Sequence, residues 1–200
     1  GWPDIFVFND YVSNDFLYIN NGDGTFSDKA GTAFKHTSYS AMGNDIADMN
    51  NDGSPDLVEV DMLPPDNYRK KMMLGATNHD RYRSELQYGY EPQLMRNSLH
   101  LNHGINAGGT PVFSEIAQLS GVAATDWSWS PLFADLDNDG WKDLMITNGY
   151  PRDITNRDFI NYRAQDLMQE HANESLQKKR FAALQKLDGA LLPNFVFQNQ

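Results

Sequence analysis

The sequence contains no cysteine, which excludes disulfide bridges and thiolate metal sites. It has no apolar run near the roughly 18 residues that a membrane-spanning helix needs, so no transmembrane segment is expected. The first residues also lack the pattern of a signal peptide. Basic residues are scarce, because 16 Lys and Arg stand against 27 Asp and Glu, a formal net charge of −11. Nucleic acids and anionic membrane surfaces bind to basic patches, so this charge argues against both as partners.

The residues that are present indicate a folded, strand-rich chain. Hydrophobic residues make up 40% of the 200 residues and aromatic residues 12%, which is too many for a disordered acidic tail. Aromatic side chains favour strands, and the 15 glycines, together with many Asn and Asp, favour turns. We therefore predict a mainly β fold.

Much of the acidity lies in two similar segments, residues 48–56 and 135–143, which we call the first and second acidic loops. Both read D-x-[DN]-x-D-G-x-x-D, and they start 135 − 48 = 87 positions apart. Each is followed by an apolar run typical of a strand, 57–60 and 144–147. The two loops are therefore predicted to be equivalent parts of an internal repeat.

A hairpin pattern lies upstream of each acidic loop. Residues 16–28 read as a strand, a tight turn around Asn-Gly-Asp-Gly and a second strand. Residues 98–104 and 112–115 read the same way, with more residues in the turn. The repeating unit is thus predicted as hairpin, loop, strand, acidic loop and strand, which resembles one blade of a β-propeller.

Both ends of the sequence resemble parts of this unit. Residues 1–8 are similar to 140–147, and residues 194–199 are similar to the start of the hairpin at 15–20. We therefore expect a partial β-propeller, a fragment of a longer protein with about two complete blades plus partial blades at both ends. A third acidic loop would be truncated at Asp4. Because a closed propeller needs about four to eight blades, the remaining blades of the parent chain are expected partners.

Two segments interrupt the repeats. Residues 61–93 are too long for a turn and are predicted to be a partly helical insertion. Residues 155–188 have apolar residues at helical spacing, and Thr155 with Asp158 matches a capping box, so a long C-terminal helical segment is expected. The predicted divisions are 1–60 (a partial blade and the blade of the first acidic loop), 61–93 (insertion), 94–152 (the blade of the second acidic loop), 153–190 (helical segment) and 191–200 (the first strand of a further blade).

The acidic loops carry the oxygen ligands of a hard dication. Ca²⁺ takes six to eight oxygens at about 2.3–2.6 Å, and alternating side chains of a tight loop converge on one point. Position 7 supplies a backbone carbonyl, and Gly at position 6 permits the bend. Mg²⁺ fits less well, and Zn²⁺ and copper are disfavoured without Cys or clustered His. We predict two Ca²⁺ sites, with ligands Asp48, Asn50, Asp52, Ser54 (carbonyl) and Asp56 in the first, and Asp135, Asp137, Asp139, Trp141 (carbonyl) and Asp143 in the second.

Two other interpretations of the acidic loops stay open. Asp, Asn and Gly form turns without any metal, although two such loops at equivalent positions would then hold repelling carboxylates. An EF-hand needs Glu at position 12 and helices on both sides. Glu59 satisfies that position in the first loop, but Ile146 occupies it in the second. Because strands are expected around both loops, we favour a β-loop site and expect Glu59 to face outward.

These residues resemble a known family. Residues 17–26 read L-Y-I-N-N-G-D-G-T-F, which is similar to the signature of the FG-GAP or VCBS repeat proteins, whose propeller blades carry a calcium loop. Residues 126–149 resemble the subgroup of cartilage acidic protein and the bacterial ASPIC/UnbV-type proteins, and within it the large surface proteins of Bacteroidota. The resemblance covers about 1–60 and 94–150. It implies calcium at the positions given above, weaker binding where Asn50 removes a charge, and an extracellular or outer-membrane surface location.

These features predict a non-enzymatic, calcium-stabilised scaffold that binds a protein or glycan at the cell surface, with the insertion as part of the binding face. The alternative is part of a propeller-fold polysaccharide lyase or hydrolase that uses calcium. The five histidines form no catalytic motif, and His100 and His103 flank a hairpin turn, where surface positions are expected. A third hypothesis is an oligomerisation module built on the C-terminal helix.

Overall fold

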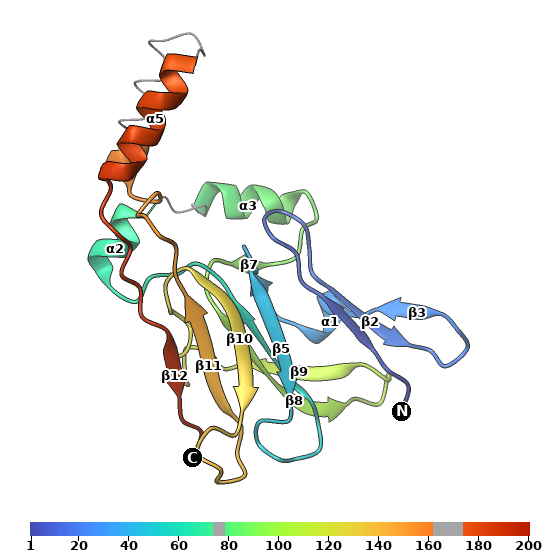
Figure 1. The fold of residues 1–200 in the computed structure, drawn as a ribbon. Helices are drawn as coiled ribbons and strands as arrows, with labels where there is room; N and C mark the ends of the chain where they lie inside the picture. The colour runs from blue at the N-terminus through green and yellow to red at the C-terminus, as the bar shows by residue number, and fades with distance from the viewer. Residues whose placement is uncertain (74–78, 162–173) are drawn as a thin grey trace.

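The computed structural model describes residues 1–73, 79–161 and 174–200. Three antiparallel sheets stand side by side, and we call them the N-terminal, central and C-terminal sheets (Figure 1). The two acidic loops lie at one end of these sheets, and the helices of the insertion lie at the other (Figure 1). The predicted mainly β class is confirmed.

The strands of the N-terminal sheet are β1 (Ile5–Val7), β2 (Phe16–Asn20) and β3 (Phe26–Asp28), in the order β1-β2-β3. The β2–β3 connection is a tight turn, in which Gly22 has a φ of 78°. The Asp23 carboxylate accepts hydrogen bonds from the backbone N–H and the hydroxyl of Thr25, at 2.9 and 2.6 Å. A short helix, α1 (Ala30–Ala33), follows the sheet.

The central sheet has four antiparallel strands: β5 (Gly43–Ala47), β6 (Asp56–Val60), β8 (Ser98–Ile105) and β9 (Pro111–Glu115). The insertion leaves the sheet after β6 and returns to β8. It contains helices α2 (Asn67–Met72) and α3 (His79–Gln87), so its partly helical character is confirmed. Its end is held by the parallel pairing of β7 (Gln93–Leu94) with β4 (Thr37–Ser38), which precedes the sheet.

The C-terminal sheet has the order β10-β11-β12, with strands β10 (Ser128–Ala134), β11 (Asp143–Asn148) and β12 (Phe195–Phe197). The strand β12 comes from the end of the chain and returns to the free edge of β11. A register shift between Ser128 and Ser130 marks a bulge in β10.

The strands are grouped differently from the predicted unit. In every sheet, the strand after an acidic loop pairs with the next strand along the sheet that follows it in the chain. These pairs are β6 with β8 and β11 with β12, and β1, which follows Asp4, pairs with β2 in the same way. The registers are equivalent, with Leu57 opposite His100 and Leu144 opposite Phe197. The predicted unit, in which the hairpin precedes its acidic loop, is therefore wrong, because β6 and β11 each offer a free edge to the next hairpin. The described residues form one four-stranded sheet and two three-stranded sheets, not two complete blades, and show no closed propeller.

Two hydrophobic clusters hold neighbouring sheets together. The cluster between the central and C-terminal sheets has these buried members: Val58, Val60, Leu99, Ala117, Val122, Phe133, Leu144 and Ile146. The cluster between the N-terminal and central sheets consists of Leu17, Ala30, Ala33, Phe34 and Leu57. At the first interface a Cβ on Gly43 would lie 2.5 Å from the carbonyl oxygen of Trp129, so β5 and β10 pack closely only because residue 43 has no side chain.

The C-terminal helix α5 (Glu174–Lys186) has 13 residues and projects away from the sheets (Figure 1). The structure does not support the single long helix expected over 155–188, and residues 162–173 of that prediction lie outside the described part. No helix among the described residues is both long and apolar enough to cross a membrane.

The residue that caps the start of the predicted helical segment also differs from the predicted one. The Asn156 side chain accepts hydrogen bonds from the backbone N–H groups of Asp158 and Phe159, at 3.0 and 3.4 Å, and so caps the first turn. The Thr155 hydroxyl instead hydrogen-bonds Tyr150 and Asp153. The predicted Thr155–Asp158 capping box is therefore wrong, because the neighbouring Asn supplies the cap.

Candidate metal centre

The two acidic loops have the same backbone path. The first loop joins β5 to β6, and the second joins β10 to β11. Positions 4 and 6 have positive φ in both, at Asn51 (56°) and Gly53 (88°), and at Asn138 (65°) and Gly140 (95°). The left-handed region is open to Gly and tolerated by Asn, so the Asn and Gly of each motif permit the bend.

The first Asp of each loop organises the backbone of its own loop. The Asp48 carboxylate accepts hydrogen bonds from the N–H groups of Asp52 and Gly53, at 3.0 and 2.8 Å. Asp135 makes the same two bonds in the second loop, to Asp139 and Gly140, at 3.0 and 2.9 Å. These bonds hold each carboxylate over the concave side of its loop.

The last Asp of each loop fixes the loop to the sheet. One Asp56 oxygen accepts the N–H of Met49 at 2.9 Å, and the other accepts the N–H of Asn102 on β8 at 2.8 Å. Asp143 repeats this arrangement with Leu136 and Asn199, at 3.0 and 2.9 Å. Burial raises the pKa of Asp56, although the two backbone hydrogen bonds oppose that rise. Position 9 therefore closes the loop and positions its carboxylate at the same time.

The second loop brings three predicted ligands together. Asp135, Asp137 and Asp143 each offer a carboxylate oxygen, and these oxygens lie within 4.8 Å of one another. Asp143 is buried, whereas Asp137 is exposed and accepts a 2.6 Å hydrogen bond from the side-chain amide of Gln198. Asp139 is outside this group, and its carboxylate accepts the N–H of Trp141 at 2.8 Å. Three converging carboxylates are a suitable donor set for a hard cation such as Ca²⁺.

The first loop differs at position 3. The Asn50 side-chain N–H₂ donates to the carboxylate of Asp52 at 2.9 Å, and this bond, with the N–H of Ser54, lowers the pKa of Asp52. Within the described residues, the only group of three converging acidic or histidine side chains is the one in the second loop. Because position 3 is the neutral Asn50, the first loop has one acidic side chain fewer than the second. The carbonyls of Ser54 and Trp141 stay predicted ligands.

The two loops touch one another. The Asn51 side chain donates to the carbonyl oxygen of Gly140 at 3.2 Å, and the Asn199 side chain donates to the carbonyl of Met49 at 2.7 Å. The loops lie beside each other at the end of the central and C-terminal sheets (Figure 1). The two loops are thus linked directly by one hydrogen bond, and the end of the chain is linked to the first loop by another.

A supporting asparagine in each sheet was missed from the sequence. Asn102 and Asn199 donate their backbone N–H to position 9 of an acidic loop, and Asn20 donates to Asp4 in the same way at 2.8 Å. Asp4 therefore stands where Asp56 and Asp143 stand, as predicted for a third loop. The signal was present in the sequence, because each Asn comes four residues after the first residue of its strand, which is Phe16, Ser98 or Phe195.

Two expected surface residues are buried. His100 is 1% exposed, and burial lowers the pKa of its imidazole to about 3. Glu59 is 0% exposed and faces the N-terminal sheet. The outward positions predicted for both are wrong, because β6 and β8 are interior strands covered on both faces.

Residues 1–59, from before β1 almost to the end of β6, match the family model described as FG-GAP-like repeat. The match includes the whole first acidic loop, so the resemblance to FG-GAP and VCBS proteins is confirmed at the level of the family. No curated protein matches the chain.

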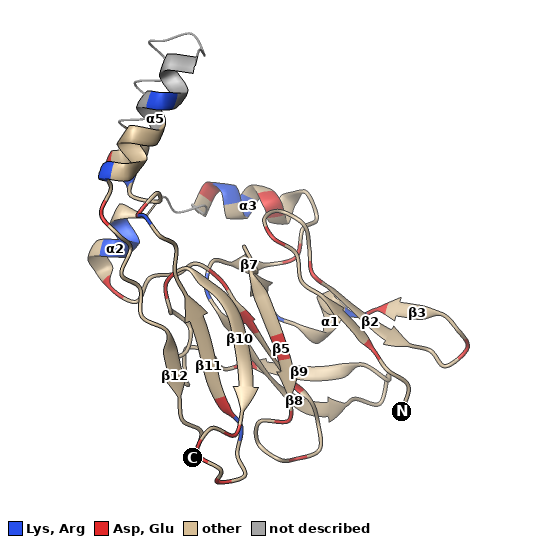
Figure 2. Cartoon of the chain, viewed as in Figure 1, with Lys and Arg blue, Asp and Glu red and all other residues tan. Residues whose placement is uncertain are grey.

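Parts of the matched segment have structural equivalents later in the chain. The acidic loop, the strand after it and the strand that pairs with that strand recur in the C-terminal sheet with the same register and the same hydrogen bonds to position 9. Lys and Arg are most frequent on the helices, whereas Asp and Glu occur at the loop end and also along the strands and on α3 (Figure 2).

Proposed function

We propose that the chain is a calcium-stabilised segment of an extracellular repeat scaffold and that it has no catalytic activity. The observation that carries this proposal is the convergence of Asp135, Asp137 and Asp143 within a loop whose backbone the first acidic loop repeats. FG-GAP-like repeats are typically extracellular, where calcium is abundant enough to fill such loops. We propose two sites, of which the second is the tighter.

Calcium in these loops would have a structural role. A ligand that binds only the native state stabilises it in proportion to RT ln(1 + [L]/Kd), about 2.7 kcal/mol at a hundredfold excess over Kd. It would also neutralise the repulsion among the carboxylates of each loop. Because the loops contact each other through Asn51 and Asn199, filled sites would stiffen the junction between the central and C-terminal sheets.

The opposite end of the sheets is proposed as the binding face. Tyr68 on α2 and Tyr88 after α3 are 74% and 84% exposed. Arg81 lies over the rings of Tyr11 and Tyr39, 5.1 Å from each centroid. Exposed Tyr and Arg side chains are common at protein and glycan interfaces, so a protein or a glycan at the cell surface is the proposed partner. We also assign the chain to the ASPIC/UnbV and cartilage acidic protein-like subgroup, on the pattern of residues 126–149, and to a cell-surface or outer-membrane location.

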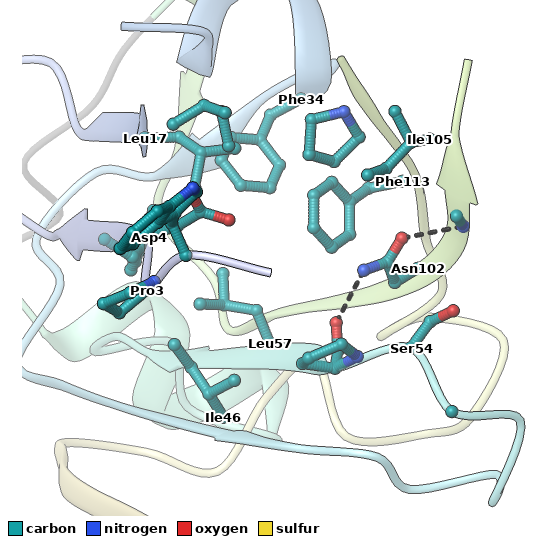
Figure 3. Close-up of a pocket in the computed structure, with 17 residues that line it drawn as sticks. Pro3, Asp4, Leu17, Phe34, Ile46, Ser54, Leu57, Asn102, Ile105 and Phe113 are labelled. Atoms are coloured by element: carbon teal, nitrogen blue, oxygen red, sulfur yellow. Dashed lines mark hydrogen bonds between the residues drawn. The ribbon is translucent and has the colours of Figure 1, made fainter. Parts of the chain in front are cut away.

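The alternative is part of a polysaccharide lyase or hydrolase, and the cavity between two of the sheets in the described part of the chain does not favour it. A cavity of about 480 Å³ lies between the N-terminal and central sheets, beside the first acidic loop (Figure 3). Its lining is mainly apolar and includes Leu17, Phe34, Leu57 and Phe113, with Asp4 as its one carboxylate and no His, Lys or Arg. Such a lining offers no base for proton abstraction from a sugar.

Thermal unfolding of the 200-residue chain tests the proposal. Calcium should raise the Tm, EDTA should remove the rise, and magnesium at equal concentration should give a smaller one. A matched variant with Asp80→Asn, whose side chain is fully exposed on α3, should behave as the wild type. Equal Tm values with calcium and with EDTA would exclude the proposed role.

A further inference from the structure

Two carboxylates face each other inside the protein, away from the acidic loops. Asp15 precedes β2 in the N-terminal sheet, and Glu59 lies on β6 in the central sheet. They are 2% and 0% exposed, and they interact directly with one another. No salt bridge from a described Lys, Arg or His reaches either of them. Two buried, unpaired carboxylates would repel strongly if both were ionised.

Each carboxylate is only half satisfied. One Asp15 oxygen, Oδ1, accepts the N–H of Asn9 at 2.7 Å, and one Glu59 oxygen, Oε2, accepts the N–H of Ser38 at 3.2 Å. The other two, Asp15 Oδ2 and Glu59 Oε1, are buried without a well-placed hydrogen-bond donor. The buried Thr37 hydroxyl interacts with Asp15 and opposes the rise of its pKa, but its single proton serves at most one of the two oxygens. Buried polar atoms normally have partners, so a further donor is needed here.

The repeat itself shows which donor is missing. Asn97 precedes β8 as Asp15 precedes β2, and its Oδ1 accepts the N–H of Asp61 at 2.8 Å, just as Asp15 accepts that of Asn9. The Asn97 amide nitrogen then donates to Thr125 and to a backbone carbonyl, at 2.6 and 2.8 Å. Asp15 thus places an oxygen where the next repeat has an N–H₂ donor.

We propose that Asp15 and Glu59 share one proton, which supplies the missing donor and ties the N-terminal sheet to the central sheet. The proton sits between Asp15 Oδ2 and Glu59 Oε1 and converts one carboxylate into a hydrogen-bond donor for the other. When it is lost, two like charges face each other across the sheet interface, and the interface weakens. The pair therefore acts as a pH-dependent latch, independent of the calcium proposed above.

A metal ion fits this place less well than a proton. The adjacent cavity, lined by Asp15, His36, Thr37 and Glu91 among others, has a volume of about 10 Å³, at most enough for one water. Only three oxygens, two carboxylate and one hydroxyl, are available here, whereas Ca²⁺ takes six to eight. A shared proton needs only two oxygens.

The electrostatic surroundings support a retained proton. Burial, with the nearby charge of Asp15 and Asp61, raises the pKa of Glu59 well above its ordinary value, and burial also raises the pKa of Asp15. Burial raises the pKa of Asp61 to about 6, with a contribution from Asp10. His36 and Glu91 line the small cavity, and His36 is paired with Glu115, which also binds Arg96.

The sign of the pH effect follows from linkage. Because the folded pKa values are raised, the folded chain binds more protons than the unfolded chain, so stability falls as pH rises. The fall starts near the ordinary pKa values, 3.8 for Asp and 4.5 for Glu, and continues up to the raised pKa of the pair. The two groups titrate together, so the loss belongs to the pair.

Thermal unfolding of the full chain in EDTA, from about pH 5 to pH 8, tests the latch through Asp15→Asn, Glu59→Gln and the control Asp80→Asn. Asp15→Asn restores the amide that the next repeat has at Asn97. Both pair variants should reduce the fall in Tm with pH relative to the wild type, by about 3–5 °C for each unit by which the pKa is raised. The control should follow the wild-type curve.

Infrared spectroscopy provides a second readout that does not depend on stability. At neutral pH the wild type should show the C=O stretch of a buried protonated carboxyl group, and Glu59→Gln should reduce it. Pair variants with the same pH profile and the same carboxyl band as the wild type would overturn the proposal. A cation-dependent rise in Tm that disappears in Asp15→Asn but survives in Asp137→Asn would also overturn it, because it would place a metal between the two carboxylates.

Discussion

Replacing Asp137 by Asn should have opposite effects on stability without and with calcium. Asp137 is an exposed member of the converging group, and the acceptor of the 2.6 Å bond from Gln198 remains available as the amide oxygen of Asn. The substitution therefore removes a charge and leaves the shape of the loop nearly unchanged. In EDTA it should relieve repulsion, and in calcium it should remove a charged ligand.

The size of the effect follows from the geometry of the group. The three carboxylate oxygens lie within 4.8 Å of one another, and two unit charges at that separation repel by about 0.9 kcal/mol in water. Asp137 takes part in two such pairs, so its neutralisation should stabilise the calcium-free chain by up to about 2 kcal/mol at low salt. For a chain of this size that corresponds to a rise in Tm of about 4–8 °C. Loss of one of three charges should weaken calcium binding by about tenfold or more.

Calorimetry measures both quantities on the same samples. Scanning calorimetry in EDTA gives the Tm, and isothermal titration with calcium gives the affinity, for the wild type, Asp137→Asn and Asp80→Asn. A lower Tm for Asp137→Asn in EDTA, together with an unchanged calcium affinity, would refute the idea that these carboxylates form a cation site.

Substitutions at Asn50 and at Gly43 test other parts of the structure. Asn50→Asp should strengthen calcium binding at the first acidic loop, because it adds a charge there. Asn50→Ala should cost less calcium affinity than Asp137→Ala. Isothermal titration measures both effects, and the reverse ranking of the two Ala variants would contradict the charge argument. Gly43→Ala should destabilise the chain by about 1–3 kcal/mol or more in urea unfolding, because its Cβ would lie 2.5 Å from a backbone oxygen. Gly189→Ala is the control, because its Cβ would lie 3.7 Å from the carbonyl oxygen of Pro151, and equal unfolding midpoints for the two variants would contradict the close β5–β10 packing.

Local features of the fold were predictable because they depend on short stretches of sequence. The acidic loops, the strands at 57–60 and 144–147 and the hairpin at 16–28 follow from turn residues and apolar runs. The grouping of these pieces into sheets was not predictable in the same way. The sequence of β6 is compatible with pairing to the hairpin before it or to the hairpin after it. Only the return of the chain after the insertion decides that β8 pairs with the free edge of β6.

The candidate site shows the same division. Loop spacing identified Asp135, Asp137 and Asp143, which the structure brings together. The backbone support from Asn102 and Asn199 depends on strand pairing between distant segments, so loop spacing alone did not reveal it. Glu59 was expected outside because alternation along a strand indicates one wet face, but packing of two sheets on the central sheet buries both faces.

Terbium luminescence tests the central claim, cation binding in the acidic loops, most directly. Tb³⁺ takes oxygen ligands as Ca²⁺ does and emits when a nearby indole is excited, and Trp141 stands at position 7 of the second loop. The account predicts sensitised emission from the wild type and from Asp80→Asn, displacement by excess calcium, and loss of the signal in an Asp135→Asn/Asp137→Asn double variant. Emission that is absent in the wild type, or that persists unchanged in the double variant, would contradict it.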